Sequence, residues 1–330
     1  MKAFSGAGTP ADLMIDLSVV STMYGSEASI REFCGRVTAA AAQVTSRYEI
    51  VLVNDGSPDR SCAIAHDLAA SDPHVRVVDL SRNFGHHKAM MTGLAYAHGQ
   101  RVFLIDSDLE EDPALLLAFW KQLDALDGVD VVYGYQTQRR GAWFERWTGA
   151  LFWQLFTTAT RLKVARNLST VRLMTRRYVD ALIRYQESEF FFAGIAETVG
   201  FRQVPLAITK LHRSQTTYSI VKKVALAIDA ITSFSAVPLI FIFLFGILVA
   251  SLAFGFAIFV FLRKSFSSAP IALGWSSQIF SIWLLGGLII SFLGVIGIYL
   301  AKIYSEVKRR PFSVVRDVRP AERVQPVDRD

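Results

Sequence analysis

Residues 101–108 read Arg-Val-Phe-Leu-Ile-Asp-Ser-Asp, an apolar run that ends in two carboxylates one residue apart. Residues 101–105 have the length and the apolar character of a buried strand. Short apolar runs of the same kind occur on either side of this stretch, at residues 15–23, 49–53, 75–80 and 130–133. We predict that these runs are the strands of one sheet.

Segments of helical character lie between the first four runs, at residues 27–42, 63–70 and 88–97. Strands that alternate with helices through short connections form right-handed crossovers and a mostly parallel sheet covered on both faces. The predicted fold class is therefore α/β and Rossmann-like. Ligands bind such sheets outside the carboxyl ends of the strands. Polar clusters fall at three of these ends, at residues 22–24, 54–57 and 106–108.

Two long apolar stretches follow the sheet region, at residues 237–262 and 279–300. Each reaches the roughly 20 apolar residues that a helix needs to cross a bilayer. Arg263 and Lys302 lie just outside them. We therefore predict a carboxyl-terminal hairpin of two transmembrane helices, and a protein held in a lipid bilayer.

The basic residues around the hairpin predict its orientation. Lys222 and Lys223 precede the first stretch, and a basic cluster from Lys302 to Arg310 follows the second, which places both ends in the cytoplasm. Arg263 and Lys264 argue the other way but are outnumbered. Residues 1–12 lack a signal-peptide pattern. We expect a multi-pass protein of the inner (plasma) membrane with a cytoplasmic catalytic domain.

Composition limits the alternatives. A chain of 330 residues has room for one soluble domain and a small membrane module. The net charge of +6 comes with no nucleic-acid-binding motif, so we expect anionic lipid and no nucleic acid as partner. The predicted organisation is an extension at 1–14, a catalytic domain at 15–218, a juxtamembrane amphipathic helix at 219–235, the hairpin at 236–302 and a tail at 303–330. We expect the tail beyond Pro311 to be poorly ordered, and residues 143–156 either to pack in the core or to lie in the head-group region.

Asp106 and Asp108 are the main candidates for chemistry. Two carboxylates that follow a strand can share one hard cation, such as Mg²⁺ or Mn²⁺, and leave coordination sites for phosphate oxygens. The alternative is a solvated turn or a helix start, because Glu110 and its neighbours extend the acidic run. Asp55 ends another strand and can line the same crevice, although residues 54–57 also fit an ordinary turn.

The histidines and cysteines do not predict a metal site or a disulfide framework. His86 and His87 are adjacent and face different directions, so we expect capping or phosphate contact rather than a two-histidine metal site. Cys34 and Cys62 are too few and too isolated for a disulfide framework or a zinc site, and we interpret them as buried thiols in a reducing compartment. No P-loop and no Gly-x-Ser-x-Gly elbow occurs, which disfavours P-loop kinases and serine hydrolases.

The ordered motifs resemble glycosyltransferase family 2. They are Asn-Asp-Gly-Ser-Pro-Asp at 54–59, Leu-Ser-Arg-Asn-Phe-Gly-His at 80–86, Ile-Asp-Ser-Asp-Leu at 105–109 and Asp-Val-Val-Tyr-Gly at 130–134, followed by the two apolar stretches. Within the family, the chain resembles the polyprenyl-phosphate glycosyltransferases, which are related to dolichol-phosphate mannose synthases and bacterial undecaprenyl-phosphate glucosyltransferases. The resemblance covers residues 17–311 and implies a glycosyltransferase-A type fold.

The resemblance also implies an activity: inverting transfer of a sugar from a nucleotide-diphosphate-sugar, with uridine as the default base, to polyprenyl phosphate. The product would supply lipid-linked sugar for modification of cell-surface polysaccharide or lipopolysaccharide. A magnesium or manganese ion would be held by Asp108, Asp106 and Glu110. The remaining residues expected at the site fall in three groups: catalytic, Asp106, Asp108, Arg146 and Arg172; nucleotide-binding, Thr22, Tyr24, Glu27, Asp55, Lys88, Asp106 and Ser107; lipid-phosphate-binding, Arg172, Lys210, Arg213, Thr217, Tyr218 and Lys222.

The chain departs from the family pattern at several positions. Residues 24–27 read Tyr-Gly-Ser-Glu where Tyr-Asn-Glu-Glu is common, Gln136 stands where arginine is frequent, and Glu110 replaces a glutamine. Residues 169–173 read Ser-Thr-Val-Arg-Leu, without the aspartate that often precedes this segment. A missing carboxylate is tolerable for a phosphate nucleophile, which is already anionic and needs no general base.

Two alternative functions predict sequence features that differ from those of this chain. A hydroxyl-acceptor family 2 synthase predicts a Gln-x-x-Arg-Trp segment and more membrane spans, and the sequence contains neither. A non-catalytic membrane scaffold predicts loss of the metal carboxylates, yet Asp106 and Asp108 are present. Glycines at 286, 287, 294 and 297 permit close helix packing inside the hairpin or between copies, so a homo-oligomer stays open.

Overall fold

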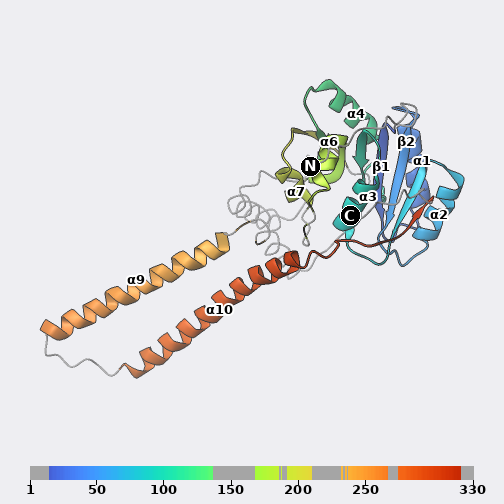
Figure 1. Ribbon diagram of the computed structural model, residues 1–330. Coiled ribbons are helices and arrows are strands. Elements are labelled where there is room, and N and C mark those ends of the chain that lie inside the picture. Colours follow the sequence, from blue (N-terminus) through green and yellow to red (C-terminus); the bar gives the residue numbers. More distant parts are fainter. Residues whose placement is uncertain are drawn as a thin grey trace, which may run out of the picture. The chain divides into compact units, whose positions relative to one another are not determined.

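The computed structural model describes residues 15–136, 168–185, 187, 192–209, 232, 235, 237–266 and 274–320. The chain divides into two compact units. The first contains residues 1–146, 163–217 and 310–330, and the second contains residues 147–162 and 218–309. Figure 1 shows a sheet with its covering helices in the first unit and two long helices in the second.

The first unit is built on a sheet of eight strands in the order β7-β5-β6-β4-β1-β2-β3-β8. Strands β1 to β4 pair in parallel, as do β5 and β7, whereas β6 and β8 pair antiparallel with their neighbours. The predicted α/β, Rossmann-like and mostly parallel sheet is confirmed. The strands are β1 (Leu17–Met23), β2 (Tyr48–Asn54), β3 (Val75–Leu80), β4 (Arg101–Leu104), β5 (Val131–Gln136), β6 (Leu168–Thr175), β7 (Gln203–Ile208) and β8 (Val315–Arg319).

Helices pack on both faces of this sheet and bury its central strands, which are apolar on both sides. Leu17 and Val19 belong to a core that includes Phe33 of α1 and Phe119 of α4. Val20 lies on the other face, where it approaches Gly93 of α3. The helices of this unit are α1 (Ile30–Ala41), α2 (Ser61–Ser71), α3 (His86–Tyr96), α4 (Leu115–Ala125), α6 (Arg176–Leu182) and α7 (Phe192–Thr198).

The carboxyl-terminal tail corrects one expectation. Strand β8 pairs antiparallel with β3, although we expected residues beyond Pro311 to be poorly ordered. The pairing is extended by a bond from the N–H of Ser81 to the carbonyl of Val314 (2.9 Å) and by a bond between the hydroxyls of Thr92 and Ser313 (2.7 Å). The physical reason is that β3 would otherwise present unpaired backbone groups at a sheet edge, and β8 satisfies them.

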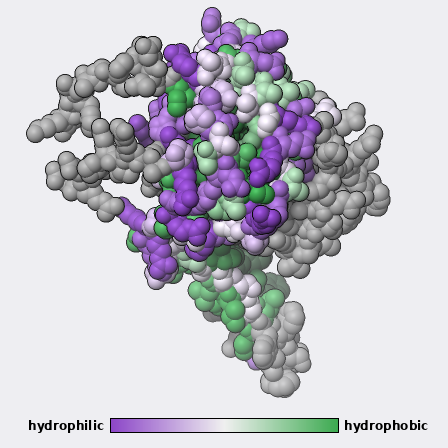
Figure 2. Space-filling view, turned by 90° about the vertical axis from the view of Figure 1, so that its right-hand side faces the viewer, coloured by the Kyte–Doolittle hydropathy of each residue, from purple (hydrophilic) through white to green (hydrophobic). Residues whose placement is uncertain are grey.

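The second unit contains α9 (Val237–Phe266) and α10 (Trp275–Val307), which occupy the positions of the two predicted membrane stretches. Many of their large apolar side chains are exposed, among them Phe241, Phe256 and Ile290. Figure 2 shows this apolar character in green, in contrast to the largely hydrophilic surface of the sheet unit. By length and composition, the described residues contain one helix that can cross a membrane, at 284–307, and a shorter apolar helix at 237–249. The presence of helices at both positions is confirmed, and two crossings stay a prediction.

Candidate active site

The candidate active site lies at the carboxyl ends of three adjacent strands, β4, β1 and β2. Thr22 is near the end of β1, Asp55 directly follows β2, and Asp106 follows β4. These are residues that the sequence pattern selected, and the parallel pairing brings them to one edge of the sheet. A pocket is lined there by Thr22, Met23, Tyr24, Asp55, Asn83 and His86.

Asp55 is buried at this edge of the sheet, and its carboxylate has a fixed orientation. It is 2% exposed, and its two carboxylate oxygens accept bonds from the N–H groups of Phe84 (2.7 Å) and Gly85 (3.0 Å). Burial raises the pKa of Asp55, although these N–H groups and the nearby His86 and Arg82 favour the ionised form. The carboxylate therefore joins the loop after β2 to the loop before α3.

Gly56 explains why these two loops can lie so close together. Its φ is +64°, which glycine adopts without strain. A Cβ atom at this position would lie 2.5 Å from the backbone nitrogen of Asn83 and 2.6 Å from the carbonyl carbon of Arg82. The Asn-Asp-Gly-Ser motif is therefore needed for contact between loops as well as for a turn.

His86 spans the distance between β1 and β4. It is the first residue of α3, and its Nδ1 lies 3.0 Å from the hydroxyl of Thr22. Its Nε2 lies 3.4 Å from Oδ1 of Asp106. The sequence predicted capping or phosphate contact for this histidine. In the structure, His86 lies between Thr22, which lines the pocket, and Asp106 of the acidic cluster.

The acidic cluster combines a fixed and an accessible carboxylate. Asp106 has 21% of its side chain exposed, and its Oδ2 accepts a 2.7 Å bond from the hydroxyl of Thr170 on β6. Asp108 is exposed, and its Oδ1 accepts a bond from the N–H of Glu110 (2.9 Å). Leu109 lies between Asp108 and Glu110 in the chain and has a φ of +60°. This left-handed conformation makes a tight turn of residues 108–110. Together these oxygen donors suit a hard divalent cation.

A buried hydroxyl network supports the loop between β1 and α1. The hydroxyl of Ser107 donates to the carbonyl of Thr22 (2.8 Å) and lies 3.0 Å from the hydroxyl of Ser26.

The neighbours of Ser26 in the segment 24–27 are exposed. Tyr24 is 57% exposed and lines the pocket. Glu27 is exposed, its N–H donates to Asp59 and its carboxylate accepts from the N–H of Arg60. Ser26 thus occupies the centre of the Tyr-Gly-Ser-Glu departure from the family pattern and ties it to Ser107.

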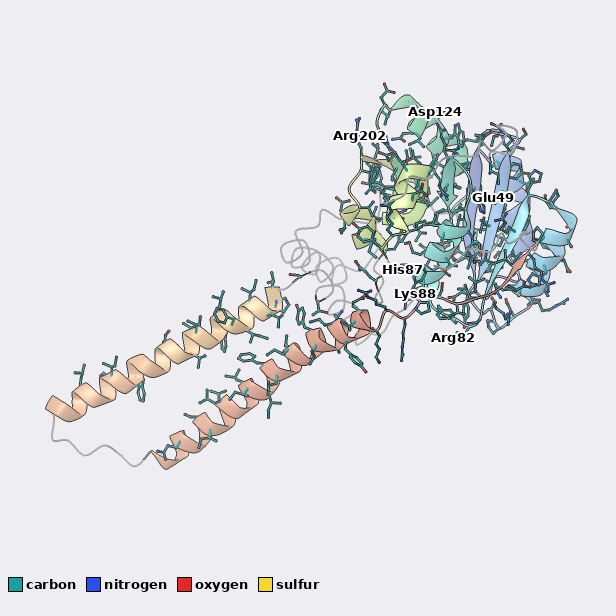
Figure 3. All side chains as sticks on the ribbon, viewed as in Figure 1. Glu49, Arg82, His87, Lys88, Asp124 and Arg202 are labelled. Carbon is teal, nitrogen blue, oxygen red and sulfur yellow. The ribbon has the colours of Figure 1, made fainter. Side chains whose placement is uncertain are left out.

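Lys88 lies on the first turn of α3, two residues after His86 (Figure 3). It is partly exposed. It is absent from the residues that line the pocket of Thr22 and Asp55. Lys88 therefore shares the first turn of α3 with His86 and lies outside the lining of that pocket.

Arg172 lies deep in the sheet unit, where we expected a residue available to phosphate. It is 3% exposed, its guanidinium stacks on Phe192 at 4.4 Å, and its Nε donates to the carbonyl of Thr170 (3.2 Å). Burial lowers the pKa of Arg172, and burial raises the pKa of its neighbour Tyr178 to about 12. Arg172 lines a separate small pocket with Tyr133, Leu168, Ala193, Ala196, Glu197 and Gln203.

The remaining predicted residues lie outside the described part of the chain: Arg146, Lys210, Arg213, Thr217, Tyr218 and Lys222. The predicted aromatic segment at 143–156 and nearly all of the juxtamembrane helix at 219–235 lie outside it as well. Conversely, sequence reasoning gave no role to Thr170 or Asn83. Thr170 stands in the segment that was noted for its missing aspartate, and only the β4–β6 pairing brings it to Asp106.

A second cluster of potential ligands lies at the β3 side of the sheet. Cys62, His66 and Asp79 each offer one ligand atom, and these atoms all lie within 4.8 Å of one another. Counting cysteines alone missed this group, because His66 and Asp79 complete it. Burial and the adjacent Asp79 raise the pKa of the Cys62 thiol to about 11. Cys34 is buried, as expected, and desolvation raises its pKa to about 12.

Comparison with known proteins agrees with the motifs. Residues 18–182 match the model of the family described as glycosyl transferase family 2. A protein of Mycobacterium tuberculosis named as a putative glycosyltransferase is 45% identical, over 92% of this chain and 88% of its own. The Bacillus subtilis glycosyltransferase YkcC is 36% identical, over 92% and 94%. An Aeromonas hydrophila protein named undecaprenyl-phosphate 4-deoxy-4-formamido-L-arabinose transferase is 30% identical, over 89% and 91%. With its family model, its relatives and its α/β sheet in agreement, the chain belongs to glycosyltransferase family 2 and has the glycosyltransferase-A fold.

Proposed function

We propose that this glycosyltransferase moves a sugar from a nucleotide-diphosphate-sugar to polyprenyl phosphate, with inversion at the anomeric carbon. The observation that carries the proposal is the convergence of Asp55, Asp106 and Asp108 at one edge of the sheet, beside an open pocket. A nucleotide-sugar has a base and ribose at one end and a diphosphate at the other. The buried Asp55 matches the base and ribose, and the acidic pair Asp106 and Asp108 matches the diphosphate through a bound cation.

The donor's base and ribose are assigned to the pocket of Thr22, Tyr24 and Asp55. Asp55 accepts from two backbone N–H groups and keeps a fixed orientation, so it can act as a directional acceptor for a base. Tyr24, exposed at the pocket, offers a ring face for stacking. Uridine is the proposed base. The other proposed nucleotide contacts are Glu27, Lys88, Asp106 and Ser107.

Asp108, Asp106 and Glu110 are proposed to hold Mg²⁺ or Mn²⁺. When bound, the cation supplies charge neutralisation for the diphosphate leaving group. Its proposed ligands are carboxylates of unequal exposure, which fits a site that exchanges substrate oxygens: Asp106 is braced by Thr170, whereas Asp108 is exposed. His86 lies beside Asp106 and is positioned to contact the same end of the donor.

The acceptor is proposed from chemistry and from the names of relatives. Several relatives near 30% identity are named undecaprenyl-phosphate transferases, and their similarity covers most of this chain. A lipid phosphate is anionic at pH 7 and attacks without a general base. In keeping with this, the described β6 residue that contacts Asp106 is a neutral threonine.

The membrane part of the proposal has the catalytic domain at 15–218 facing the cytoplasm and a hairpin at 236–302 in the inner membrane. A polyprenyl acceptor resides in the bilayer, so an anchor would keep enzyme and acceptor together. The helix at 284–307 supports an anchor. Phosphate contacts are proposed for Arg146, Lys210, Arg213, Thr217, Tyr218 and Lys222. Arg172, itself a residue of β6, is proposed to hold that strand in place rather than to contact phosphate, because its buried guanidinium stacks on Phe192 and donates to the carbonyl of Thr170.

Transfer of radiolabel tests the function directly. Purified full-length protein is incubated with undecaprenyl phosphate, Mg²⁺ or Mn²⁺ and each member of a panel of labelled nucleotide-sugars, and the label in the organic phase is counted. We expect one donor to give label that depends on the lipid and is lost with chelator. Asp108→Ala should abolish the label without unfolding the protein. Label on a sugar or protein hydroxyl instead of the lipid would contradict the proposed acceptor.

A further inference from the structure

We propose that Cys62, His66 and Asp79 bind a zinc ion, at a site distinct from the carboxylates proposed for the catalytic cation. Cys62 and His66 lie one helical turn apart on α2, so both side chains face the same side of that helix. Asp79 comes from β3, which packs against α2. Two secondary-structure elements of the scaffold thus supply the three ligands.

The distances between the ligand atoms fit a tetrahedral metal. Nε2 of His66 lies 3.0 Å from Oδ2 of Asp79, Sγ of Cys62 lies 3.5 Å from the same oxygen, and the sulphur and the nitrogen are 3.8 Å apart. Zinc bonds of about 2.0–2.3 Å at tetrahedral angles separate ligand atoms by about 3.3–3.6 Å. A cation can therefore enter with shifts of a few tenths of an ångström. The three-ligand set leaves a fourth position for water.

The donor set selects zinc over the hard cations. Thiolate and imidazole are the ligands that zinc prefers, whereas Mg²⁺ and Mn²⁺ prefer oxygen donors such as Asp106 and Asp108. Asp79 is 2% exposed and accepts a 3.0 Å bond at Oδ1 from the amide of Asn54. That bond leaves Oδ2 for the metal and serves as the outer support that zinc ligands commonly have. Binding releases the Cys62 proton to solvent, because the thiolate is the metal ligand.

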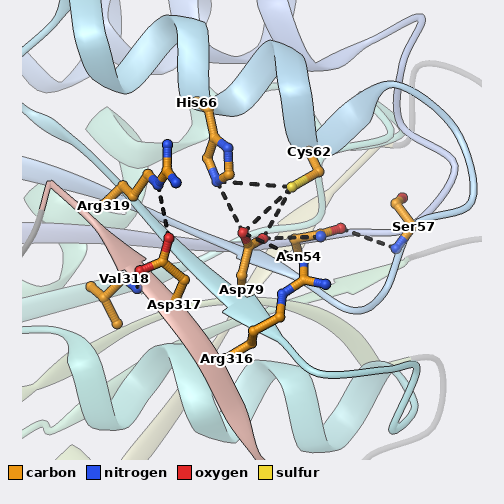
Figure 4. A network of polar contacts seen from close by, with 9 residues as sticks. All are labelled: Asn54, Ser57, Cys62, His66, Asp79, Arg316, Asp317, Val318 and Arg319. Atoms are coloured by element: carbon orange, nitrogen blue, oxygen red, sulfur yellow. Dashed lines mark hydrogen bonds and ion pairs between the residues drawn. The ribbon is translucent and has the colours of Figure 1, made fainter.

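Strand β8 contributes a competitor for the same carboxylate. A guanidinium nitrogen of Arg316 lies 3.8 Å from Oδ2 of Asp79, beyond a hydrogen bond, and its side chain is 60% exposed. Figure 4 shows Arg316 beside the cluster, with Arg319 paired to Asp317 on the same strand. Arg316 can swing into solvent when a cation arrives. Zinc and Arg316 therefore compete for Asp79, and this competition gives the site a testable signature.

The cluster is linked to the loops of the active site. Asn54, which donates to Asp79, accepts a 3.1 Å bond from the N–H of Ser57. The hydroxyl of Ser57 in turn accepts a 2.8 Å bond from the N–H of Gly25, the residue after Tyr24. A metal on Asp79 would hold Asn54 and, through it, the loop at 54–57. We assign the zinc a positioning role in the scaffold, outside the chemical step.

The test measures cobalt and zinc binding to the full-length protein in detergent. Co²⁺ bound to a thiolate gives a near-ultraviolet charge-transfer band that oxygen ligands do not give, so the band reports Cys62 independently of activity. We expect the wild-type protein to show this band with one Co²⁺ per chain, displaced by Zn²⁺. Asp108→Ala should keep the band, since it alters only the proposed catalytic cation.

The variants separate the zinc site from a simple hydrogen-bond network. Cys62→Ser and His66→Ala remove direct ligands and should weaken zinc binding by more than the roughly 10- to 100-fold that loss of an outer-shell partner costs. Cys34→Ser is the matched control that leaves zinc binding unchanged. Arg316→Gln should strengthen zinc binding several-fold. Wild-type protein without the band, or a Cys62→Ser variant that binds zinc like wild type, would overturn the proposal. Circular dichroism of each variant confirms that it is folded.

Discussion

The hydroxyl of Thr170 donates a 2.7 Å hydrogen bond to Oδ2 of Asp106, across 64 residues of sequence. The bond joins strand β6 to the first carboxylate of the acidic cluster, and β4 and β6 are antiparallel neighbours. A hydroxyl that donates to a carboxylate fixes its orientation and leaves its charge available. Asp106 is thus braced from one side and approached by His86 from the other.

Replacing Thr170 tests whether this brace matters to the reaction. Thr170→Val removes a hydrogen bond to a charged group, which is worth about 1.5–3 kcal/mol, so we expect kcat/KM to fall about tenfold or more. The concentration of Mn²⁺ needed for half-maximal activity should rise, because Asp106 loses its fixed orientation. Thr170→Ser should recover most of the activity.

Thr198→Val is the matched control, since the Thr198 hydroxyl donates a 2.8 Å bond to the carbonyl of Gly194 within its own helix. It should leave the metal requirement unchanged. Equal losses in Thr170→Val and Thr198→Val would mean that the bond to Asp106 has no special part in the reaction.

Arg172 should contribute to stability more than to acceptor binding. Its buried guanidinium stacks on Phe192 and donates to the carbonyl of Thr170. Arg172→Ala leaves a cavity and an unpaired carbonyl, at a cost of about 2–4 kcal/mol. We expect a lower thermal midpoint by tryptophan fluorescence, and KM values for donor and lipid that change together. A selective rise in the KM for polyprenyl phosphate at unchanged stability would instead favour direct phosphate contact.

Substitution of Gly56 and of Gly35 by alanine should change stability in opposite directions. Gly56→Ala places a Cβ 2.5 Å from the backbone of Asn83 at a φ of +64°, so the loops must separate. We expect lower stability and weaker donor binding, measured as the KM for the nucleotide-sugar. Gly35→Ala meets nothing within 4 Å inside helix α1 and should raise stability by about 0.5–1 kcal/mol. Unchanged donor binding in Gly56→Ala would contradict the proposed need for close loop approach.

Glu49 should make the stability of the sheet unit depend on pH. Burial opposes its ionisation, but bonds from the His98 side chain, the Ser18 hydroxyl (2.6 Å) and the His98 backbone N–H (2.6 Å) outweigh burial and lower the pKa of Glu49. Its stabilisation is therefore fully present above the ordinary glutamate pKa and is lost as the pH falls through the lowered folded-state pKa. Figure 3 labels Glu49 on β2.

Glu49→Gln should lower the free energy of unfolding at pH 7 by about 1–3 kcal/mol, and the difference from wild type should shrink in acid. Glu32→Gln is the same substitution at an exposed ion pair with Arg36 and should change stability by less than about 0.5 kcal/mol. Thermal midpoints between pH 3 and pH 7 check both. A pH-independent effect of Glu49→Gln would show that its ionised form is not what stabilises the sheet.

Removing strand β8 should expose the edge of β3. A chain that ends at residue 311 loses the pairing with Val77 to Leu80 and the bond between Thr92 and Ser313. We expect a lower thermal midpoint and more self-association, because an unpaired edge is a template for intermolecular pairing. A chain that ends at residue 320 retains β8 and serves as the control. Equal behaviour of the two truncations would mean that β8 does not protect the edge.

The sequence by itself determined the features that local patterns encode. Strand β3 was predicted with its observed bounds, and β1, β2 and β4 to within a few residues, because the apolar character of a buried strand is a short-range property. The positions of Asp55 and Asp106 at strand ends followed from the same runs. The long apolar stretches are helical as expected, since their uniform composition leaves little ambiguity.

Only the tertiary structure decided which side chains meet. Thr170 reaches Asp106 because β6 inserts antiparallel beside β4, and no local pattern in residues 168–175 specifies that neighbour. The same holds for β8, whose short run of valines and charges forms a strand only because β3 offers an open edge. His66 and Asp79 join Cys62 because α2 packs on β3. Contacts between residues distant in sequence depend on strand order and packing, which the whole chain determines together.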